Sequence, residues 1–130
     1  MEKIRLEEPL SRYILEKSHY RSDHTVKHNA FMPPQNSSEI SVYRTCDLSP
    51  QEIWDIGVTH VAIKRGKSLL GRAEIKVSDA YKQKLNVVPD ITPHIRHANI
   101  CGFPVENREI ARMIAVELSS CAKFYPHESV

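Results

Sequence analysis

The chain has 130 residues, of which 41% are hydrophobic and 26% charged, and its formal net charge is +2 at pH 7. This composition is ordinary for a globular domain that buries about two-thirds of its unfolded surface and needs neither a disulfide nor a metal ion to fold. The charge is too small to identify a nucleic-acid binder, and no apolar run approaches the roughly 20 residues that span a bilayer.

The cysteines and the N-terminal composition indicate the compartment. Cys46, Cys101 and Cys121 are widely spaced and odd in number, which argues against a disulfide framework and is typical of reduced thiols. The first twenty residues are rich in glutamate and lack the apolar core of a secretion signal. We therefore expect one cytoplasmic domain over residues 1–130, with no membrane partner.

The N-terminal third is expected to hold an arm and two strands. Residues 1–10 are predicted as a loose charged arm, 12–15 as a first strand and the alternating segment 40–44 as a second strand. Between the strands lies an unusually polar block, Arg21–His28, which has no clear period. Prolines and a turn-prone stretch follow it before the second strand.

A capping box predicts the first helix. Ser49 is suited to cap its start, Glu52 stands at the third helical position, and Gly66 follows two cations at the end. The expected core-facing stripe consists of Ile53, Trp54, Gly57, Val58 and Val61.

The C-terminal half alternates less regularly. We expect a strand over 69–77, a short helix over 78–85, a short strand at 87–88 and a long helix over 106–121. The long helix is expected to bury Ile110, Ile114 and Leu118, with Ala111, Ala115, Cys121 and Ala122 beside them. The elements predict an α+β fold: one small, mostly antiparallel sheet packed by two principal helices.

The most concentrated polar segment is Arg96–Pro104. It sets Arg96, His97 and Asn99 side by side and closes with Gly102 and Pro104, which stop regular structure. Arginine binds phosphate or carboxylate with two hydrogen bonds, and histidine gives or takes a proton near neutral pH. This segment and the block Arg21–His28 are predicted to converge on one anionic ligand.

Two arginines on predicted strands, Arg44 and Arg72, extend the candidate site. If both point into one concavity with Lys27 and Arg96, the positive charge calls for a phosphate-bearing ligand. The predicted ligand-binding residues are Arg21, Lys27, Arg44, Arg72, Arg96 and Asn99, and the predicted catalytic residues are His97, His24 and His28. The competing interpretation is that each polar block is a solvated loop and that the arginines extend from the sheet edge into water.

Metal and cysteine chemistry are disfavoured. His24 and His28, or His94 and His97, have a spacing that suits metal ligands, but flanking arginines oppose a dication and no closely spaced Cys and His pairs accompany them. A small thiol such as Cys101 between apolar residues more often packs than reacts. The sequence contains no Walker A motif, no dinucleotide-binding GxGxxG motif, no GxSxG motif of hydrolases and no HExxH motif of zinc proteases. We therefore expect no metal or other cofactor.

Four sequence blocks together resemble a family of small bacterial proteins to which no activity is securely assigned. The blocks are Arg21-x-Asp23-x-Thr25-x-Lys27, Ser41-Val42-Tyr43-Arg44, Gly71-Arg72-Ala73 and Arg96-His97-Ala98-Asn99-Ile100-x-Gly102-Phe103-Pro104. The resemblance covers about residues 12–125. It implies a bacterial or phage-borne cytosolic protein and transfers no active site. A bacterial defence setting is a separate hypothesis about its context.

The leading hypothesis is a nucleotide- or RNA-phosphate-binding protein that acts as a metal-independent phosphodiesterase. Its substrate would be a cyclic oligonucleotide or RNA, cleaved through a ribose 2′-hydroxyl with His97 as general acid or base. One alternative is a module that binds a ligand or protein without catalysis. Another is an ADP-ribosyltransferase-like enzyme, for which Glu74 or Glu39 would hold the cofactor's ribose. A site at a homodimer interface is also compatible with the sequence.

Overall fold

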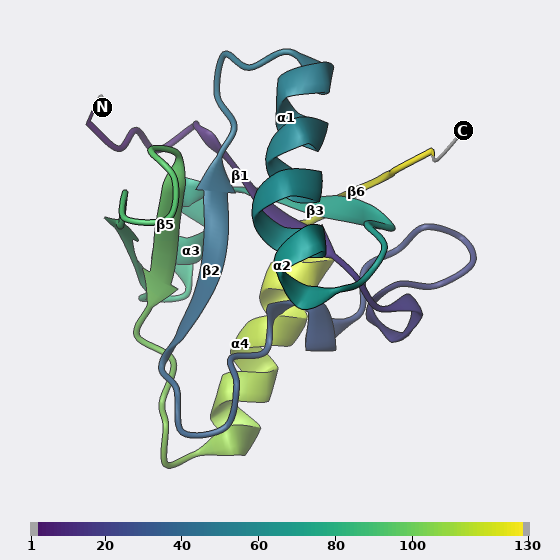
Figure 1. Ribbon diagram of the computed structural model, residues 1–130. Helices are drawn as coiled ribbons and strands as arrows, with labels where there is room; N and C mark the ends of the chain where they lie inside the picture. Colours follow the sequence, from purple (N-terminus) through teal and green to yellow (C-terminus); the bar gives the residue numbers. More distant parts are fainter. Residues whose placement is uncertain (1–2, 129–130) are drawn as a thin grey trace.

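The computed structural model describes residues 3–128 and contains a six-stranded antiparallel sheet with helices on both faces (Figure 1). The strands lie in the order β4-β5-β2-β1-β3-β6. Their bounds are β1 Pro9–Ile14, β2 Glu39–Arg44, β3 Gly71–Lys76, β4 Asn86–Pro89, β5 His97–Cys101 and β6 Lys123–Pro126. The helices are α1 Pro50–Gly57, α2 Ile63–Arg65, α3 Val77–Lys82 and α4 Arg108–Cys121, with short turns η1 Lys17–His19, η2 His28–Phe31 and η3 Val58–Ala62. The expected α+β fold is confirmed.

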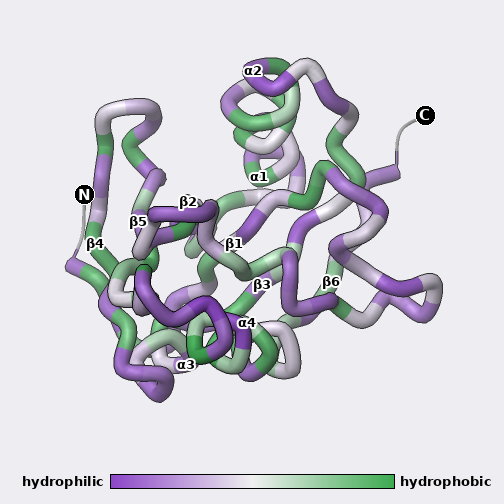
Figure 2. The backbone as a smooth tube through the Cα atoms, turned by 90° about the horizontal axis from the view of Figure 1, so that it is seen from below, coloured by the Kyte–Doolittle hydropathy of each residue, from purple (hydrophilic) through white to green (hydrophobic). Residues whose placement is uncertain are grey.

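One continuous helix covers one face of the sheet. It consists of α1, the π-helical turn η3 and α2, while α3 and α4 lie on the opposite face (Figure 2). The predicted capping box is formed, because Ser49 Oγ accepts from the Glu52 main-chain N–H at 3.2 Å and Glu52 Oε1 accepts from the Ser49 N–H at 3.1 Å. Gly66 ends the helix in the left-handed region with φ 63°, as its position predicts.

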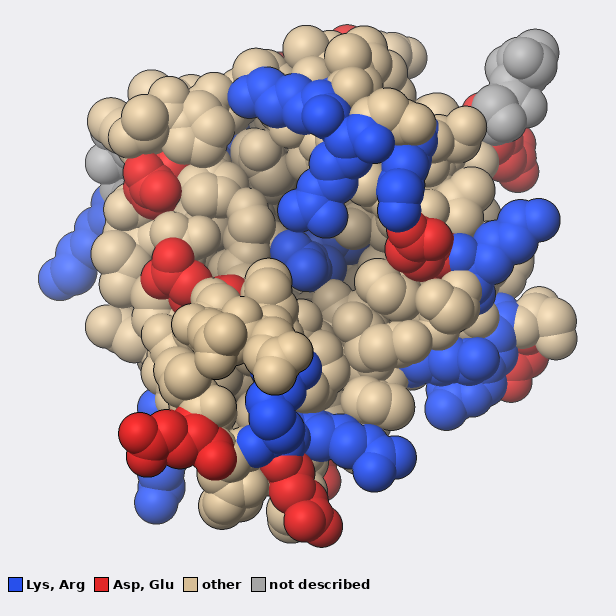
Figure 3. All heavy atoms as spheres, turned by 60° about the horizontal axis from the view of Figure 1, so that its bottom comes forward, with Lys and Arg blue, Asp and Glu red and all other residues tan. Residues whose placement is uncertain are grey.

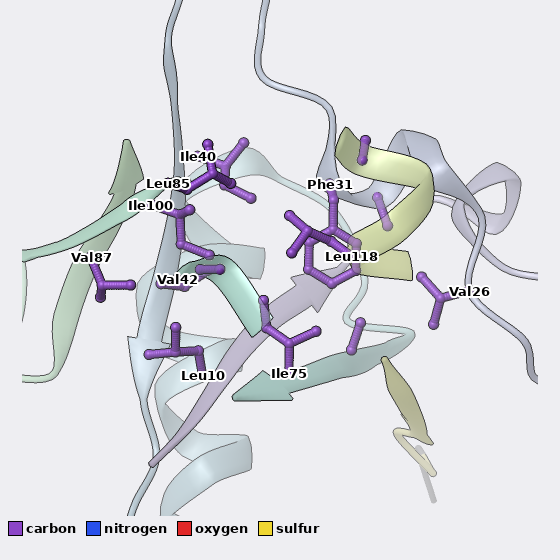
Figure 4. Close-up of a cluster of buried hydrophobic side chains, with 14 of the residues drawn as sticks. Leu10, Val26, Phe31, Ile40, Val42, Ile75, Leu85, Val87, Ile100 and Leu118 are labelled. Atoms are coloured by element: carbon purple, nitrogen blue, oxygen red, sulfur yellow. The ribbon is translucent and has the colours of Figure 1, made fainter. Parts of the chain in front are cut away.

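The main apolar core lies between the sheet and the α3–α4 face (Figure 4). Its members include Leu10, Val26, Phe31, Ile40, Val42, Ile75, Leu85, Val87, Ile100 and Leu118. A second, smaller cluster lies under the helix α1–α2 and consists of Tyr13, Tyr43, Ile53, Ile56, Ala62 and Leu69. The two clusters occupy opposite faces of the sheet because successive side chains of a strand alternate between faces.

Helix α4 buries Leu118 as predicted, but the centre of its buried stripe lies on the alanines that were expected beside it. Ala111, Ala115 and Leu118 are fully buried, whereas Ile110 is 47% exposed and the thiol-bearing Cys121 is exposed. The alanines allow the helix backbone to approach η2 closely, and this packing rotates the larger Ile110 toward solvent. Hydrophobic spacing alone did not separate the two stripes, since both have helical periodicity.

The N-terminal arm is shorter than predicted. Strand β1 begins at Pro9, and the preceding Glu8 is 3% exposed because its carboxylate pairs with the buried Arg44.

Two further strands differ from the expectation. The polar segment around His97 forms the strand β5 inside the sheet, and β6 was not predicted because it has only four residues after the helix.

The sheet opens between its two central strands. β1 pairs with β3 over all six of its residues, but its described pairing with β2 is limited to Leu10↔Arg44 and Ser11↔Tyr43. Beyond Ser11 the two strands diverge, and Figure 1 shows β1 running obliquely to β2. The Arg12 side chain bridges the gap, with Nη1 donating to the Ser41 carbonyl oxygen at 2.9 Å.

Candidate anion-binding cavity

A cavity of about 310 Å³ lies where β1 and β2 diverge, beneath the C-terminal end of the helix α1–α2. Four cationic side chains line it, namely Arg12, Lys64, Arg65 and Lys67. Three histidines, His19, His60 and His97, also line it. Figure 3 shows the corresponding face, where Lys and Arg side chains gather around a central hollow. The volume lies near the lower end of the range of about 300–1,000 Å³ that is typical of small-molecule sites.

Positive charge dominates the lining. Glu16 supplies one carboxylate to it, and that carboxylate pairs with the Lys67 ammonium, which lowers the Glu16 pKa. Within residues 3–128, the hydrogen bonds of the Arg12 guanidinium go to main-chain carbonyls, from Nε to Ala30 at 3.0 Å and from Nη1 to Ser41 at 2.9 Å. Burial, together with the charge of Arg65, lowers the pKa of Arg12 to about 10. Arg12 therefore stays cationic at neutral pH.

The imidazole of His97 has a defined orientation. His97 is 7% exposed, and its Nδ1 lies 2.9 Å from the Asp90 carbonyl oxygen. A carbonyl only accepts, so Nδ1 carries the proton in the neutral ring and Nε2 presents a lone pair. Nε2 bonds the Ser41 hydroxyl, which also lines the cavity, and Ser41 is accordingly the donor in this bond.

Asp90 and Asn99 lie on the Nδ1 side of the His97 ring. One carboxylate oxygen of Asp90, Oδ2, lies 3.8 Å from His97 Nδ1 and is positioned to stabilise a positive charge on the ring. Asn99 Nδ2 donates to the same Asp90 oxygen at 3.5 Å. Asn99 thus acts through Asp90, behind the ring, and does not line the cavity.

The π-helical turn η3 brings a further histidine to the cavity. His60 lies in this turn, its ring centroid is 4.7 Å from that of His94, and its Nδ1 is buried without a hydrogen-bond partner among the described residues. The pKa of His94 is lowered by burial and by its neighbours His60, Arg96 and His97. Burial and the charge of Arg12 likewise lower the pKa of His19. His19 and His94 are therefore neutral at physiological pH.

Arg44 and Arg72 do not point into one concavity with Lys27 and Arg96, and none of the four lines the cavity. Arg44 is 2% exposed and is held by Glu8, with Nε–Oε2 and Nη2–Oε1 distances of 2.9 Å each. The buried Arg72 bonds Ser11 and Glu74, and its guanidinium lies 4.1 Å from the centroid of the Tyr125 ring. Both arginines are engaged by the fold, because strand positions facing the interior bring acidic and aromatic partners to them.

Arg96 also differs from the prediction. Its Nη1 donates to the Cys46 carbonyl at 2.9 Å and to that of Arg44 at 3.4 Å, so it ties the end of β2 to the segment before β5. Among the predicted site residues, His97 lines the cavity and Arg96 does not.

The block 21–28 does not contribute to the cavity either. Arg21 bonds Thr25 and the Val26 carbonyl within its own loop, and the ring of the exposed His24 lies against Phe124 at 5.3 Å. The Lys27 main-chain N–H donates to the carbonyl of His19. His28, in η2, has a pKa lowered by burial and by nearby Arg112. The structure therefore does not join this block with His97 in one site.

Sequence reasoning missed most of the residues that line the cavity. The run Lys64-Arg65-Gly66-Lys67 was visible but was interpreted as the cationic end of a helix. Arg12, Ser41 and His60 stand singly on elements whose relative position no local pattern gives. The one available signal for Arg12 was a cation inside a predicted strand, and the predicted bounds of 12–15 placed it at the strand's start, whereas it is the fourth of the six residues of β1.

The residues considered for cysteine, ADP-ribosyl-transfer and metal chemistry are placed as follows. Cys101 is half-buried, and burial together with the nearby Glu39 carboxylate raises the pKa of its thiol to about 11. Glu74 bonds Arg72, and neither Glu74 nor Glu39 lines the cavity. Over residues 3–128, no group of three His, Cys, Asp or Glu side chains is placed to hold a metal ion.

No protein-family model, no curated protein and no solved structure matches the chain. None of the helices within residues 3–128 combines the length and the apolar character required to cross a bilayer.

Proposed function

We propose that the cavity binds the phosphate group of a nucleotide or oligonucleotide and that the protein is a metal-independent phosphodiesterase with His97 as its proton acceptor. The observation that carries this proposal is the charge of the lining, where four cations face one carboxylate. Arg12 matters most among them, because it is held at the strand opening by main-chain oxygens and has a lowered pKa from burial and from Arg65.

An anionic ligand would relieve this charge. Guanidinium groups bind phosphate oxygens through two parallel hydrogen bonds, and ammonium groups add point charges. Arg12 and Arg65 would supply the first kind of contact, and Lys64 and Lys67 the second. The cavity holds one phosphate and the groups bonded to it, so the remainder of an oligonucleotide would extend over the open edge.

The position of His97 supports a reaction in addition to binding. Its Nε2 lone pair faces a hydroxyl at the cavity wall, and the opposite ring nitrogen is held by Asp90. A base held in this way takes a proton from an attacking hydroxyl and returns it to the leaving oxygen. The nearby cations would stabilise the negative charge that develops on the phosphoryl oxygens.

Ligand-induced stabilisation and turnover test the two parts of this proposal separately. We expect oligoribonucleotides or mononucleotides to raise the melting temperature, since a ligand at 100 times its Kd adds about 2.7 kcal/mol to the free energy of unfolding. The double variant Lys64→Ala/Arg65→Ala should lose this shift. The matched control Lys82→Ala removes an exposed cation of α3 and should keep it.

Cleavage is measured with linear and cyclic oligoribonucleotides in EDTA. We expect cleavage by the wild type and none by His97→Ala. A melting-temperature shift without cleavage of any substrate would identify a binding module instead. No shift with any phosphate ester would refute the proposed site, and cleavage by His97→Ala would refute the role of the histidine.

A further inference from the structure

We propose that Ser41 is the nucleophile of this cavity and that the reaction passes through a phosphoryl group covalently bound to Ser41 Oγ. This inference rests on the proposed function, and it replaces the ribose 2′-hydroxyl with a hydroxyl of the protein. The substrate class widens accordingly to phosphodiesters that have no 2′-hydroxyl.

The register of the sheet places Ser41 beside His97. Ser41 on β2 is paired with Asn99 on β5, and Tyr43 is paired with His97, so Ser41 and His97 are diagonal neighbours. Diagonal neighbours on one face of an antiparallel pair are within reach of a long side chain. Their hydrogen bond spans the strands at the wall of the cavity.

The direction of that hydrogen bond is the central point. Because Nδ1 of His97 bonds the carbonyl of Asp90, the neutral ring accepts at Nε2, and Ser41 donates. A hydroxyl that donates to an oriented imidazole is the arrangement by which a serine is activated. A ribose hydroxyl could use His97 only after displacing Ser41.

Two charged side chains, Asp90 and Arg12, are placed to stabilise the charges that form when Ser41 attacks phosphorus. When Ser41 loses its proton, the imidazolium of His97 gains stabilisation from Asp90 Oδ2 at 3.8 Å. On the other side, Arg12 Nη1 already bonds the main-chain carbonyl of Ser41 at 2.9 Å. The guanidinium therefore lies next to the serine, where negative charge develops on the phosphoryl oxygens.

The steps balance without a further reactant except water. In the first step the Ser41 Oγ–P bond forms, the bond from phosphorus to the leaving oxygen breaks, and the serine proton passes through His97 Nε2 to the leaving alkoxide. In the second step water attacks phosphorus and gives a proton to His97. Ser41 Oγ then leaves and takes that proton, which restores the free enzyme.

Bis(4-nitrophenyl) phosphate is a suitable probe, because it is a phosphodiester without any hydroxyl. With the full chain in EDTA we expect a burst of nitrophenolate and a mass increase that peptide mapping locates on Ser41. Ser41→Ala should lose the adduct and at least about 1,000-fold in rate, which is a small part of the loss of about 10⁶-fold that removal of a serine nucleophile can cause. Ser68→Ala removes an exposed hydroxyl away from the cavity lining and should retain both.

If Ser41→Ala fails to fold, the proposal is tested on the wild type alone, by comparing its cleavage of DNA and RNA oligonucleotides. A serine nucleophile cleaves oligodeoxynucleotides and oligoribonucleotides alike, whereas a ribose 2′-hydroxyl mechanism spares the deoxy substrate. Cleavage of RNA but not DNA, or the absence of any adduct, would overturn the role of Ser41 and leave the proposed function standing. Failure of every phosphate ester to shift the melting temperature would instead refute the site itself.

Discussion

Removing one partner of the ion pair between Glu8 and Arg44 should cost more stability than removing one partner of any other described ion pair, because this pair is buried. Both side chains are 2% exposed, and two contacts of 2.9 Å join them. The main-chain N–H of Arg5 adds a third hydrogen bond to Glu8, at 2.8 Å. Glu8→Gln removes the negative charge from beside a buried guanidinium while it keeps the side-chain shape.

The expected cost is about 3–5 kcal/mol, the usual range when one partner of a buried pair is lost. This is a large fraction of the total stability of a small domain, about 5–15 kcal/mol. For a chain of this length the melting temperature should fall by roughly 10–20 °C. Urea titration followed by circular dichroism measures the change, provided that the slope m is unaltered.

The neighbouring Glu7 supplies a matched control. Its carboxylate meets Lys76 at 3.1 Å, but the two side chains are 75% and 59% exposed. Glu7→Gln should therefore cost less than about 1 kcal/mol, because water and salt screen an exposed pair. If Glu8→Gln shifts the urea midpoint no more than Glu7→Gln does, the reasoning from burial is refuted.

Two further predictions use the same titration. Burial acts to raise the Glu8 pKa, but Arg44 and Arg5 outweigh it and the pKa is lowered from its ordinary value of 4.5. The stabilisation is therefore complete above that value and is lost as pH falls through the lowered one, so the wild-type advantage over Glu8→Gln should shrink in acid. Gly57→Ala would place a Cβ 2.6 Å from the Tyr13 ring and 2.9 Å from Leu69 and should cost about 1–3 kcal/mol. At Gly66 nothing lies within 4 Å, so Gly66→Ala should show only the backbone cost of φ +63°, about 1 kcal/mol. A stable Gly57→Ala variant would contradict the close packing of α1 on β1.

Short sequence patterns predicted correctly those helices and strands whose ends are set by residues close to them in the chain. The capping box at Ser49 and the glycine at Gly66 define the two ends of the helix α1–α2, and both act within a turn of their own position. Alternation predicted the strand over 40–44 for the same reason. The long C-terminal helix was found and its Leu118 is buried as predicted. Ile110 is exposed instead of buried, because choosing between Ile110 and Ala111 depends on the element against which the helix packs.

The candidate site was predicted only in part. His97 was identified by its polar neighbours, and it does line the cavity. The arginines chosen with it are engaged elsewhere, since Arg44 pairs with Glu8 and Arg72 with Glu74. Charge and sequence spacing do not show which cations have acidic partners, because Glu8 lies far from Arg44 along the chain and because Glu74 meets Arg72 only once the two residues share one face of β3.

The sequence by itself therefore determined the class of fold and the long C-terminal helix, and it singled out His97, which lines the cavity. Only the tertiary structure decided which groups surround that histidine. The divergence of β1 from β2 opens the cavity, the register between β2 and β5 brings Ser41 to Nε2, and the helix α1–α2 adds its terminal cations. Pairing between distant strands sets the first two, and a strand register is fixed by the whole buried face rather than by any local motif. Packing of the helix on Tyr13 and Tyr43 sets the third.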